Sequence, residues 1–271
     1  MWGFSPSGVT MGRETPMRIE PAEFYDELAE HYHLIFENWD RSMERQAGIL
    51  GPILESAAGP APLSILDCAC GIGTQAIGLA RRGHKVTGSD LSGAAVVRAR
   101  REAAERGLAI EFSVADMRDL KSYGESCFDA VVACDNALPH LLNAEDLAAA
   151  LRQIYLRLRK NGVLLATIRD YDAMLRSRPA VQPAAFISDG GLRRIVHQVW
   201  DWEGDEYTVH LYITLERADG WRVLHFVSRY RALRRADLTR ALDGAGFDEI
   251  RWMDSAETGL YQPVVVARRA H

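Results

Sequence analysis

A short loop at residues 66–74 has the composition of a ligand-binding turn. It reads Leu-Asp-Cys-Ala-Cys-Gly-Ile-Gly-Thr, so an apolar strand ends in an acid and then opens into small residues. Gly71, Gly73 and Ala76 satisfy the pattern G-x-G-x-x-[GA]. In that pattern glycines let backbone N–H groups approach a pyrophosphate at a helix N-terminus. The pattern alone is compatible with a dinucleotide, bound by an oxidoreductase or by a non-catalytic nucleotide-binding module.

Asp67, at the end of the strand before this loop, changes the prediction. A carboxylate there would repel the negative charge of a pyrophosphate but attract the cationic amino-acid end of S-adenosylmethionine. We therefore expect a methyl-donor site that includes Asp67, Ala69, Gly71 and Gly73, with S-adenosylhomocysteine as the product left after transfer.

Acids also end the next two predicted strands. Asp90 lies about twenty residues beyond the loop, where an acid accepts hydrogen bonds from ribose hydroxyls, and Leu91 follows it in the same expected site. The alternative for Asp90 is a helix N-cap, a role that Ser92 can fill alone. Asp116 is expected to contact the adenine amino group and Met117 to pack on the ring; the alternative for Asp116 is a surface-loop acid.

The fourth predicted strand ends in the segment Cys-Asp-Asn-Ala-Leu-Pro-His at residues 134–140. Ligands of such sheets bind at the carboxyl ends of the strands, so Cys134 is expected beside the cofactor and Asn136 beside the methyl acceptor. Asn136 offers donors and an acceptor to a small amine, and His140 could take its proton near neutral pH. The alternative for His140 is a structural hydrogen bond. The segment is not the Asn/Asp-Pro-Pro-aromatic motif of enzymes that methylate nucleic-acid bases.

Arg169 follows the fifth predicted strand. An arginine at the mouth of a central strand is partly buried, and its planar guanidinium binds a carboxylate in a bidentate manner. We therefore expect Arg169 to hold a substrate carboxylate. The alternative is an intramolecular salt bridge to Asp170 or Asp172.

Apolar periodicity predicts the elements that position these residues. Strands and helices alternate, which indicates a Rossmann-like, mostly parallel seven-stranded sheet with helices on both faces, two N-terminal helices and a final antiparallel strand. The expected strands are 63–69, 85–89, 110–115, 128–134, 163–169, 249–253 and 262–268; the expected helices start at Pro21 and at about Asp40 and then span 74–82, 93–106, 145–160 and 235–245.

Two regions depart from this alternation. Residues 191–233 have a period of two and predict an antiparallel β insertion that forms a substrate lid between the methyl-donor domain segments 20–190 and 234–271. Residues 1–19 lack periodicity and are expected to be a flexible extension. The insertion is rich in aromatic residues, which predict a small core with one or two side chains lining the pocket as a cation–π wall: Trp200, Trp202, Tyr207, Tyr212, Trp221, Phe226 and Tyr230.

Composition limits the class of protein. The chain of 271 residues is 48% hydrophobic and 25% charged, with a net charge of -5, which disfavours a partner that is nucleic acid. Its four cysteines lack the spacing of a zinc site or a disulfide framework, so no metal and a reducing compartment are expected. No apolar run approaches the ~20 residues of a membrane span, and we expect a cytoplasmic protein without a membrane partner. The sequence leaves open whether it forms a homo-oligomer.

Four segments together resemble the glycine and glycine/sarcosine N-methyltransferases. They are residues 32–44, which contain Tyr-His-Leu-Ile-Phe and Arg-Ser-Met-Glu, the loop at 67–74, Asp-Asn-Ala-Leu-Pro-His-Leu at 135–141, and Ile-Arg-Asp-Tyr-Asp at 168–172. The similarity runs over roughly residues 22–268 and implies a class I methyltransferase fold. Ala69 departs from the resemblance, since many members carry glycine there, and it requires ordinary backbone angles.

The resemblance also implies roles for individual residues. Tyr32 and Arg41 would contact the methyl donor, whereas Asn136 and Arg169 would hold an amino-acid substrate. Tyr171, in the segment of Arg169, and Tyr261, at the start of the last strand, are further expected substrate residues. The sequence thus predicts direct methyl transfer to a small amine that bears a carboxylate, such as glycine or sarcosine. The alternative acceptor is an amino sugar or a secondary metabolite.

Overall fold

The computed structural model describes residues 20–189 and 192–270, so the expectation for residues 1–19 lies outside the described residues. A seven-stranded sheet forms the centre of the molecule, in the order β10-β11-β5-β4-β1-β2-β3. Only β11 runs antiparallel to its neighbours in this sheet, which confirms the expected plan. The strands are β1 (Ser64–Asp67), β2 (Lys85–Asp90), β3 (Glu111–Val114), β4 (Phe128–Ala133), β5 (Leu158–Thr167), β10 (Phe247–Met253) and β11 (Val264–Arg269).

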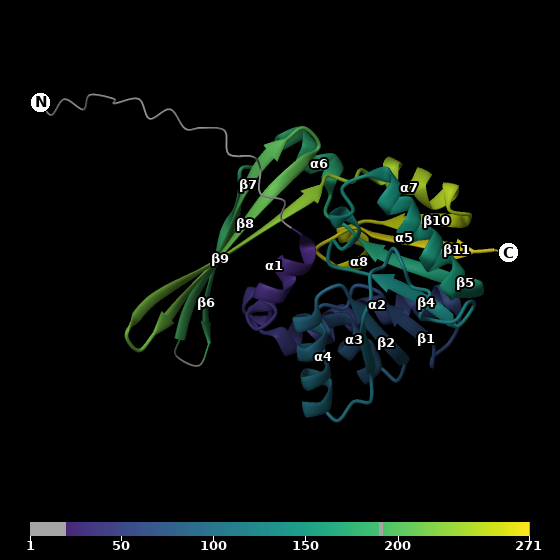
Figure 1. Cartoon of the computed structure of the whole chain (residues 1–271), viewed down its shortest axis with the longest axis horizontal. Helices are drawn as coiled ribbons and strands as arrows, with labels where there is room; N and C mark the ends of the chain where they lie inside the picture. Colours follow the sequence, from purple (N-terminus) through teal and green to yellow (C-terminus); the bar gives the residue numbers. More distant parts are fainter. Residues whose placement is uncertain (1–19, 190–191, 271) are drawn as a thin grey trace, which may run out of the picture.

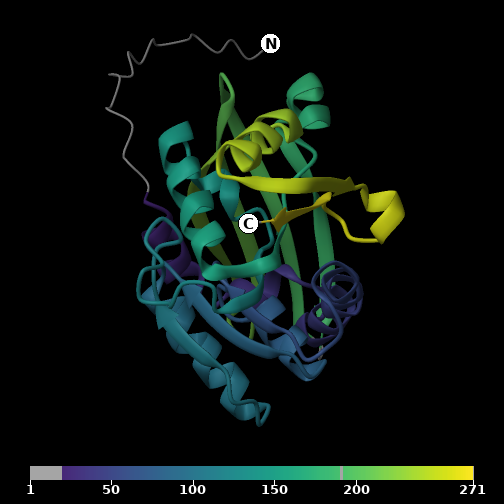
Figure 2. The same ribbon diagram turned by 90° about the vertical axis from the view of Figure 1, so that its right-hand side faces the viewer.

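Helices cover both faces of this large sheet (Figure 1, Figure 2). The helices of the described residues are α1 (Pro21–Leu28), α2 (Trp39–Ala58), α3 (Thr74–Arg81), α4 (Gly93–Glu105), α5 (Ala144–Arg157), α6 (Tyr171–Ser177), α7 (Arg235–Gly244) and α8 (Ser255–Thr258), with 3-10 turns η1 (Tyr32–Ile35) and η2 (Leu138–His140). None of the helices in the described ranges is long and apolar enough to span a membrane.

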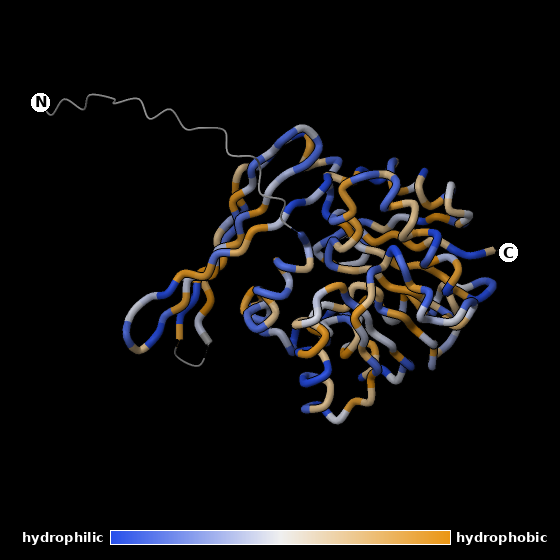
Figure 3. The backbone as a smooth tube through the Cα atoms, viewed as in Figure 1, coloured by the Kyte–Doolittle hydropathy of each residue, from blue (hydrophilic) through white to orange (hydrophobic). Residues whose placement is uncertain are grey.

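The central strands are apolar on both faces because each face is covered. In β4, Val131 and Ala133 pack in the cluster that contains residues of α5 and α7, whereas Ala130 and Val132 pack in the cluster of α2, α3 and α4. Neighbouring side chains of a strand point to opposite faces, so a buried parallel strand reads as a continuous apolar run. Hydrophobic stretches accordingly run through the strands of the large sheet (Figure 3).

A second sheet, here called sheet B, consists of four antiparallel strands in the order β6-β7-β8-β9. They are β6 (Val181–Asp189), β7 (Leu192–Glu203), β8 (Glu206–Arg217) and β9 (Gly220–Arg231). Along β8 every second residue is buried, which defines an inner face toward α1 and the large sheet. Sheet B extends away from the large sheet, with α1 beside it (Figure 1).

Three boundaries differ from the expectations. Sheet B begins at Val181, whereas the insertion was expected to begin at residue 191. The sequence does not reveal β6, because Pro183 interrupts its alternation and the pairing register shifts between Gln182 and Ala185. Helix α5 ends at residue 157 rather than 160, because the next residue, Leu158, already pairs with β4. The helical pattern that begins at Pro21 includes the run Tyr32 to Phe36 in the sequence, but in the structure α1 ends at Leu28 and residues Tyr32–Ile35 form the separate turn η1.

Candidate functional site

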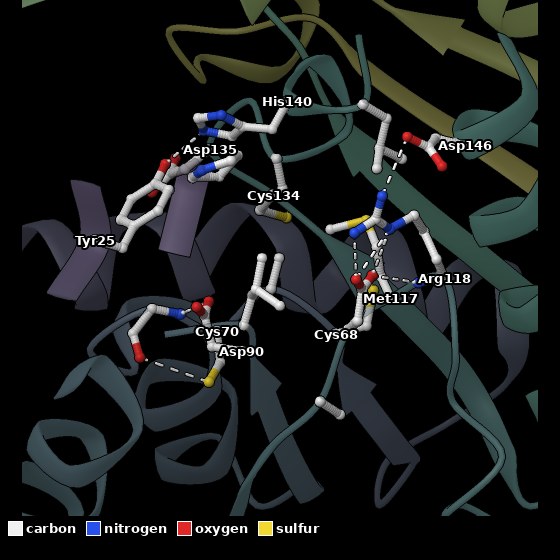
Figure 4. Close-up of a pocket in the computed structure, with 18 of the residues that line it drawn as sticks. Tyr25, Cys68, Cys70, Asp90, Met117, Arg118, Cys134, Asp135, His140 and Asp146 are labelled. Atoms are coloured by element: carbon white, nitrogen blue, oxygen red, sulfur yellow. Dashed lines mark hydrogen bonds and ion pairs between the residues drawn. The ribbon is translucent and has the colours of Figure 1, made fainter. Parts of the chain in front are cut away.

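Two adjoining cavities lie at the carboxyl ends of the parallel strands. The first, here called the strand-end cavity, has a volume of about 220 Å³ and is lined by residues between Glu20 and Asp146 (Figure 4). The second, here called the sheet cavity, has a volume of about 630 Å³ and lies between α1, η1, the ends of β4 and β5, and the inner face of sheet B. Three residues line both cavities: Tyr25, Tyr32 and Asp135.

The glycine loop forms the floor of the strand-end cavity. Gly71 has φ +51° and lines the cavity, while Gly73 has φ +98° and is the N-cap of α3 without lining it. These angles favour glycine because a Cβ would be strained there. Ala69 lines the cavity and is not among the described residues with positive φ, so its departure from glycine is compatible with this turn.

Asp67 lies beneath the loop rather than on the cavity wall. It is 1% exposed, its Oδ1 accepts a hydrogen bond from the amide of Ala69 at 3.4 Å, and its Oδ2 has no partner among the described residues. Burial raises the pKa of Asp67 to about 8, and the nearby Asp90 and Asp135 add to the rise. A cation bound nearby would lower this pKa again and restore the carboxylate.

Asp90 lies on the wall of the strand-end cavity (Figure 4). Its Oδ2 accepts a hydrogen bond from the Gly71 amide at 2.8 Å and its Oδ1 accepts one from the Ser92 amide at 2.9 Å. The N-cap of α4 is Ser92, whose Oγ accepts from Ala95 at 3.0 Å, so the cap does not depend on Asp90. Leu91 lines the same cavity and is 40% exposed.

The loop after β3 carries Asp116 and Met117 to the opposite side of this cavity. The guanidinium of Arg118 pairs with Asp116 at 2.6 Å and with Asp146 at 3.1 Å, which links this loop to the start of α5 (Figure 4). Burial opposes ionisation of Asp116, but the hydrogen bonds and charge of Arg118 outweigh it and lower the pKa of Asp116. The sequence prediction missed Arg118 and Asp146.

Sulfur atoms contribute to the apolar part of the lining. Cys68, Cys70 and Cys134 line the strand-end cavity as free, buried cysteines, and burial raises the pKa of each thiol. Thiols with raised pKa are neither good nucleophiles nor good metal ligands. Among residues 20–189 and 192–270, no group of three or more His, Cys, Asp or Glu side chains could hold a metal ion.

The partition between the two cavities has an unusual backbone. Asp135 and Asn136 have φ +54° and +69°, a conformation that costs energy in residues other than glycine and that clusters at functional sites. The carboxylate of Asp135 accepts hydrogen bonds from Gln75 Nε2 at 2.8 Å and from the hydroxyl of Tyr261 at 2.5 Å. Burial raises the pKa of Asp135, although the hydrogen bonds from Tyr261 and Gln75 oppose the rise.

His140 faces this partition from η2. Its Nε2 lies 2.9 Å from the hydroxyl of Tyr25, and its ring centroid lies 4.1 Å from that of Tyr230. Burial, followed by the charge of Arg169, lowers the pKa of His140 to about 3. A pKa this low makes the ring a weak base, which argues against the expected proton acceptance and favours the alternative, a structural hydrogen bond, here with Tyr25.

Asn136 lines the sheet cavity and is 2% exposed. Its Oδ1 accepts hydrogen bonds from the Arg169 amide at 3.1 Å and from the Tyr171 hydroxyl at 2.9 Å. Its Nδ2 has no partner among the described residues, which leaves a buried donor available to a ligand. Tyr171 lines neither cavity and lies behind Asn136, where it also contacts the Tyr207 hydroxyl at 2.8 Å.

Arg169 lines the sheet cavity with a guanidinium surrounded by neutral groups. It donates to Tyr207 Oη at 2.9 Å and to Gln198 Oε1 at 3.2 Å, and its guanidinium carbon lies 5.0 and 5.5 Å from the ring centroids of Trp200 and Tyr230. The structure records no ion pair between Arg169 and a carboxylate of the described chain.

The alternative partners of Arg169 are engaged elsewhere, because Asp170 and Asp172 contact Arg235. One further expected residue lies apart from both cavities. Arg41 is exposed on α2 and lines neither cavity, whereas Arg45, one turn later, lines the sheet cavity. Tyr261 lines the sheet cavity and Tyr32 lines both.

The loop, the strand order and the acids at the strand ends match a known family. The family described as "Methyltransferase domain" matches residues 65–162. Glycine/sarcosine N-methyltransferase of Parasynechococcus marenigrum (strain WH8102) is 30% identical over 181 residues, which cover 67% of this chain and 61% of that protein. The chain contains a class I S-adenosylmethionine-dependent methyltransferase domain. S-adenosylmethionine is therefore its cofactor, rather than the dinucleotide that the glycine pattern left open.

Solved structures support the methyltransferase fold over most of the chain. The sugar N-methyltransferase KedS8 from Streptoalloteichus sp ATCC 53650 is 20% identical, with a TM-score of 0.74 over 99% of this chain and 100% of that one. SAM-bound CalS10, an amino pentose methyltransferase from Micromonospora echinaspora, is 23% identical, with a TM-score of 0.68 over 84% of this chain and 92% of that one. At these identities the likeness establishes the fold of the methyltransferase and not its acceptor.

Proposed function

We propose that the protein is an S-adenosylmethionine-dependent N-methyltransferase whose acceptor is a small amine bearing a carboxylate, with glycine and sarcosine as the first candidates. The observation that carries this proposal is the Arg169 guanidinium, which lines the sheet cavity with neutral partners only. A partly buried arginine without a carboxylate partner favours an anionic ligand. The similarity to a glycine/sarcosine N-methyltransferase supports the same acceptor.

The residues of the strand-end cavity would hold the cofactor. Asp90 offers carboxylate oxygens to ribose hydroxyls, and Asp116, fixed by Arg118, offers an acceptor to the adenine amino group beside Met117. Asp67 lies beneath the loop that receives the amino-acid end. The cofactor, when bound, supplies an electrophilic methyl group.

Two residues of the sheet cavity, Arg169 and Asn136, would orient the acceptor. Arg169 and the free Nδ2 of Asn136 both donate, so they suit the two oxygens of one carboxylate. Holding a neutral amine in line with the methyl group would then provide most of the rate enhancement. Burial raises the pKa of Asp135 and lowers the pKa of His140. Proton acceptance is therefore assigned to Asp135 or to water.

The test compares acceptors that differ only in the carboxylate. Arg169→Ala is expected to cost ~2 to 5 kcal/mol in transition-state binding for glycine or sarcosine, measured as kcat/KM, because their carboxylate is left unpaired. Methylamine or dimethylamine should be poor substrates of the wild type and lose little further. S-adenosylhomocysteine affinity, measured by calorimetry, should barely change. Equal losses for both kinds of amine would overturn the carboxylate acceptor.

An amino sugar is the second candidate acceptor. It is favoured by the fold likeness to the sugar N-methyltransferase KedS8, which extends over 99% of this chain. A mass-spectrometric screen for methyl gain in the presence of S-adenosylmethionine distinguishes the two classes. Methylation of amino sugars that is unaffected by Arg169→Ala would favour the second.

A further inference from the structure

The lining of the sheet cavity changes along sheet B from cationic and aromatic to apolar. On the inner face, Trp200 of β7 pairs with Val209 of β8 and Gln198 pairs with Leu211. Trp200 and Gln198 both contact the Arg169 guanidinium, so this end of the cavity is cationic and aromatic. Val209 and Leu211, next to them on β8, are apolar and also line the cavity.

The opposite wall continues the apolar part. Phe24 and Leu28 of α1 line the cavity, and they belong to the same hydrophobic cluster as Val196 and Leu211 of sheet B. Ile35 of η1 packs against this cluster and lines the cavity as well. The side chains of this cluster pack on one another and are almost fully buried, so an apolar ligand segment would lie along the edge of the cluster that faces the cavity and contact carbon of both α1 and sheet B.

The dimensions exceed what a glycine molecule requires. The cavity volume of about 630 Å³ is typical of pockets for drug-sized ligands, which run from roughly 300 to 1,000 Å³. Residues on one face of a strand are spaced by about 6.7 Å, so the distance along β7 from Trp200 to Val196 is about 13 Å. A glycine whose carboxylate contacts Arg169 would leave the apolar end uncovered.

We propose that the acceptor carries an apolar substituent of several carbons that lies between α1 and the Val196–Leu211 end of sheet B. This rests on the proposed function, in which the carboxylate of the acceptor contacts Arg169. The acceptor class is then an amphipathic amino acid rather than glycine itself. Each buried methylene contributes about fourfold to binding, so the substituent would dominate selectivity.

The test uses an aliphatic series: glycine, alanine, 2-aminopentanoate and 2-aminoheptanoate. We expect kcat/KM to rise by about fourfold per methylene until the apolar end is filled. Val196→Phe shortens the cavity and should reduce kcat/KM for 2-aminoheptanoate at least tenfold, with alanine changed less than twofold. The matched control is Val199→Phe, on the outer face of the same strand, which should leave the series unchanged.

Leu211→Ala provides a second variant if Val196→Phe fails to fold, as judged by its thermal unfolding and S-adenosylhomocysteine affinity. It should lower kcat/KM for the longest acceptor and spare alanine. A flat series in which glycine is methylated and depends on Arg169 would overturn this inference and leave the proposed function intact. A rising series that is insensitive to Arg169→Ala would overturn the carboxylate contact and leave the apolar subsite.

Discussion

The carboxylate of Asp90 holds the amide of Gly71 at 2.8 Å and so ties the end of β2 to the loop that follows β1. The same carboxylate lies on the wall of the strand-end cavity. Burial raises the pKa of Asp90, although its backbone hydrogen bonds from Ser92 and Gly71 oppose the rise. One side chain thus fixes the loop and presents an acceptor to the cofactor.

Asp90→Ala should weaken binding of both S-adenosylmethionine and S-adenosylhomocysteine, by roughly 1.5 to 3 kcal/mol for a lost hydrogen bond to a charged group. Isothermal calorimetry measures both affinities. Ser92→Ala is the control, since loss of the α4 cap should lower the free energy of unfolding by about 1 kcal/mol without changing affinity. If Asp90→Ala leaves the affinity unchanged, Asp90 does not bind the cofactor, and its role is limited to its hydrogen bonds with Gly71 and Ser92.

Arg118→Ala should lower cofactor affinity about two- to fivefold and weaken its dependence on ionic strength. The guanidinium joins Asp116 to Asp146 across the cavity, but its side chain is 40% exposed, and exposed ion pairs contribute little. Arg101→Ala removes an exposed ion pair to Glu30 that is remote from both cavities and serves as the control. Similar affinity changes in the two variants would contradict a specific role for Arg118.

His140 should make the protein less stable as the pH falls. Its pKa is about 3 in the folded chain, below its ordinary value of 6.5, so the unfolded chain binds more protons between these two values. The free energy of unfolding should therefore fall from pH 6.5 toward pH 3, by up to ~1.4 kcal/mol per pH unit for this group. Denaturant unfolding at pH 7 and pH 5 should give a smaller difference in His140→Gln. An equal difference would argue against a buried neutral imidazole.

Asp135 and Tyr261 should determine the pH at which kcat rises on the acid side of its pH dependence. If Asp135 accepts the proton, kcat should rise with pH through its raised pKa, and Asp135→Asn should abolish this limb with a loss of 10² or more. Tyr261→Phe removes a hydrogen bond that lowers the pKa of Asp135, so the limb should move to higher pH. An unshifted limb in Tyr261→Phe would indicate that another group or the acceptor amine titrates.

Patterns of neighbouring residues were sufficient to predict the strands of the large sheet and the loop that follows β1. The loop at 66–74 and the acids at strand ends follow from an apolar run and the next few residues, and the structure places Asp90 and Asp116 together because parallel strands share an edge. Strand β6 was missed because its alternation is broken by Pro183 and a register shift.

The sequence did not predict several residues of the site, for a different reason. Tyr25, Arg45 and Gln198 reach the sheet cavity from α1, α2 and β7, which tertiary packing alone brings together. No local pattern indicates that Gln198 contacts Arg169, or that Tyr25 contacts His140 across 115 positions of the chain. The lowered pKa of His140 likewise comes from burial, which its flanking residues do not indicate.

None of the described residues of sheet B lines the strand-end cavity, whereas sheet B supplies one long wall of the sheet cavity. In the part of the chain that the structure describes, the two cavities share the lining residues Tyr25, Tyr32 and Asp135. If the sheet cavity holds the acceptor as proposed, changes in β6–β9 that keep Tyr230, which packs against His140 of the strand-end cavity, can change which molecule is methylated while the residues that line the donor site stay the same. In the same way, an exchange of β6–β9 that keeps Tyr230 offers protein engineers a route to new acceptors on the same donor site.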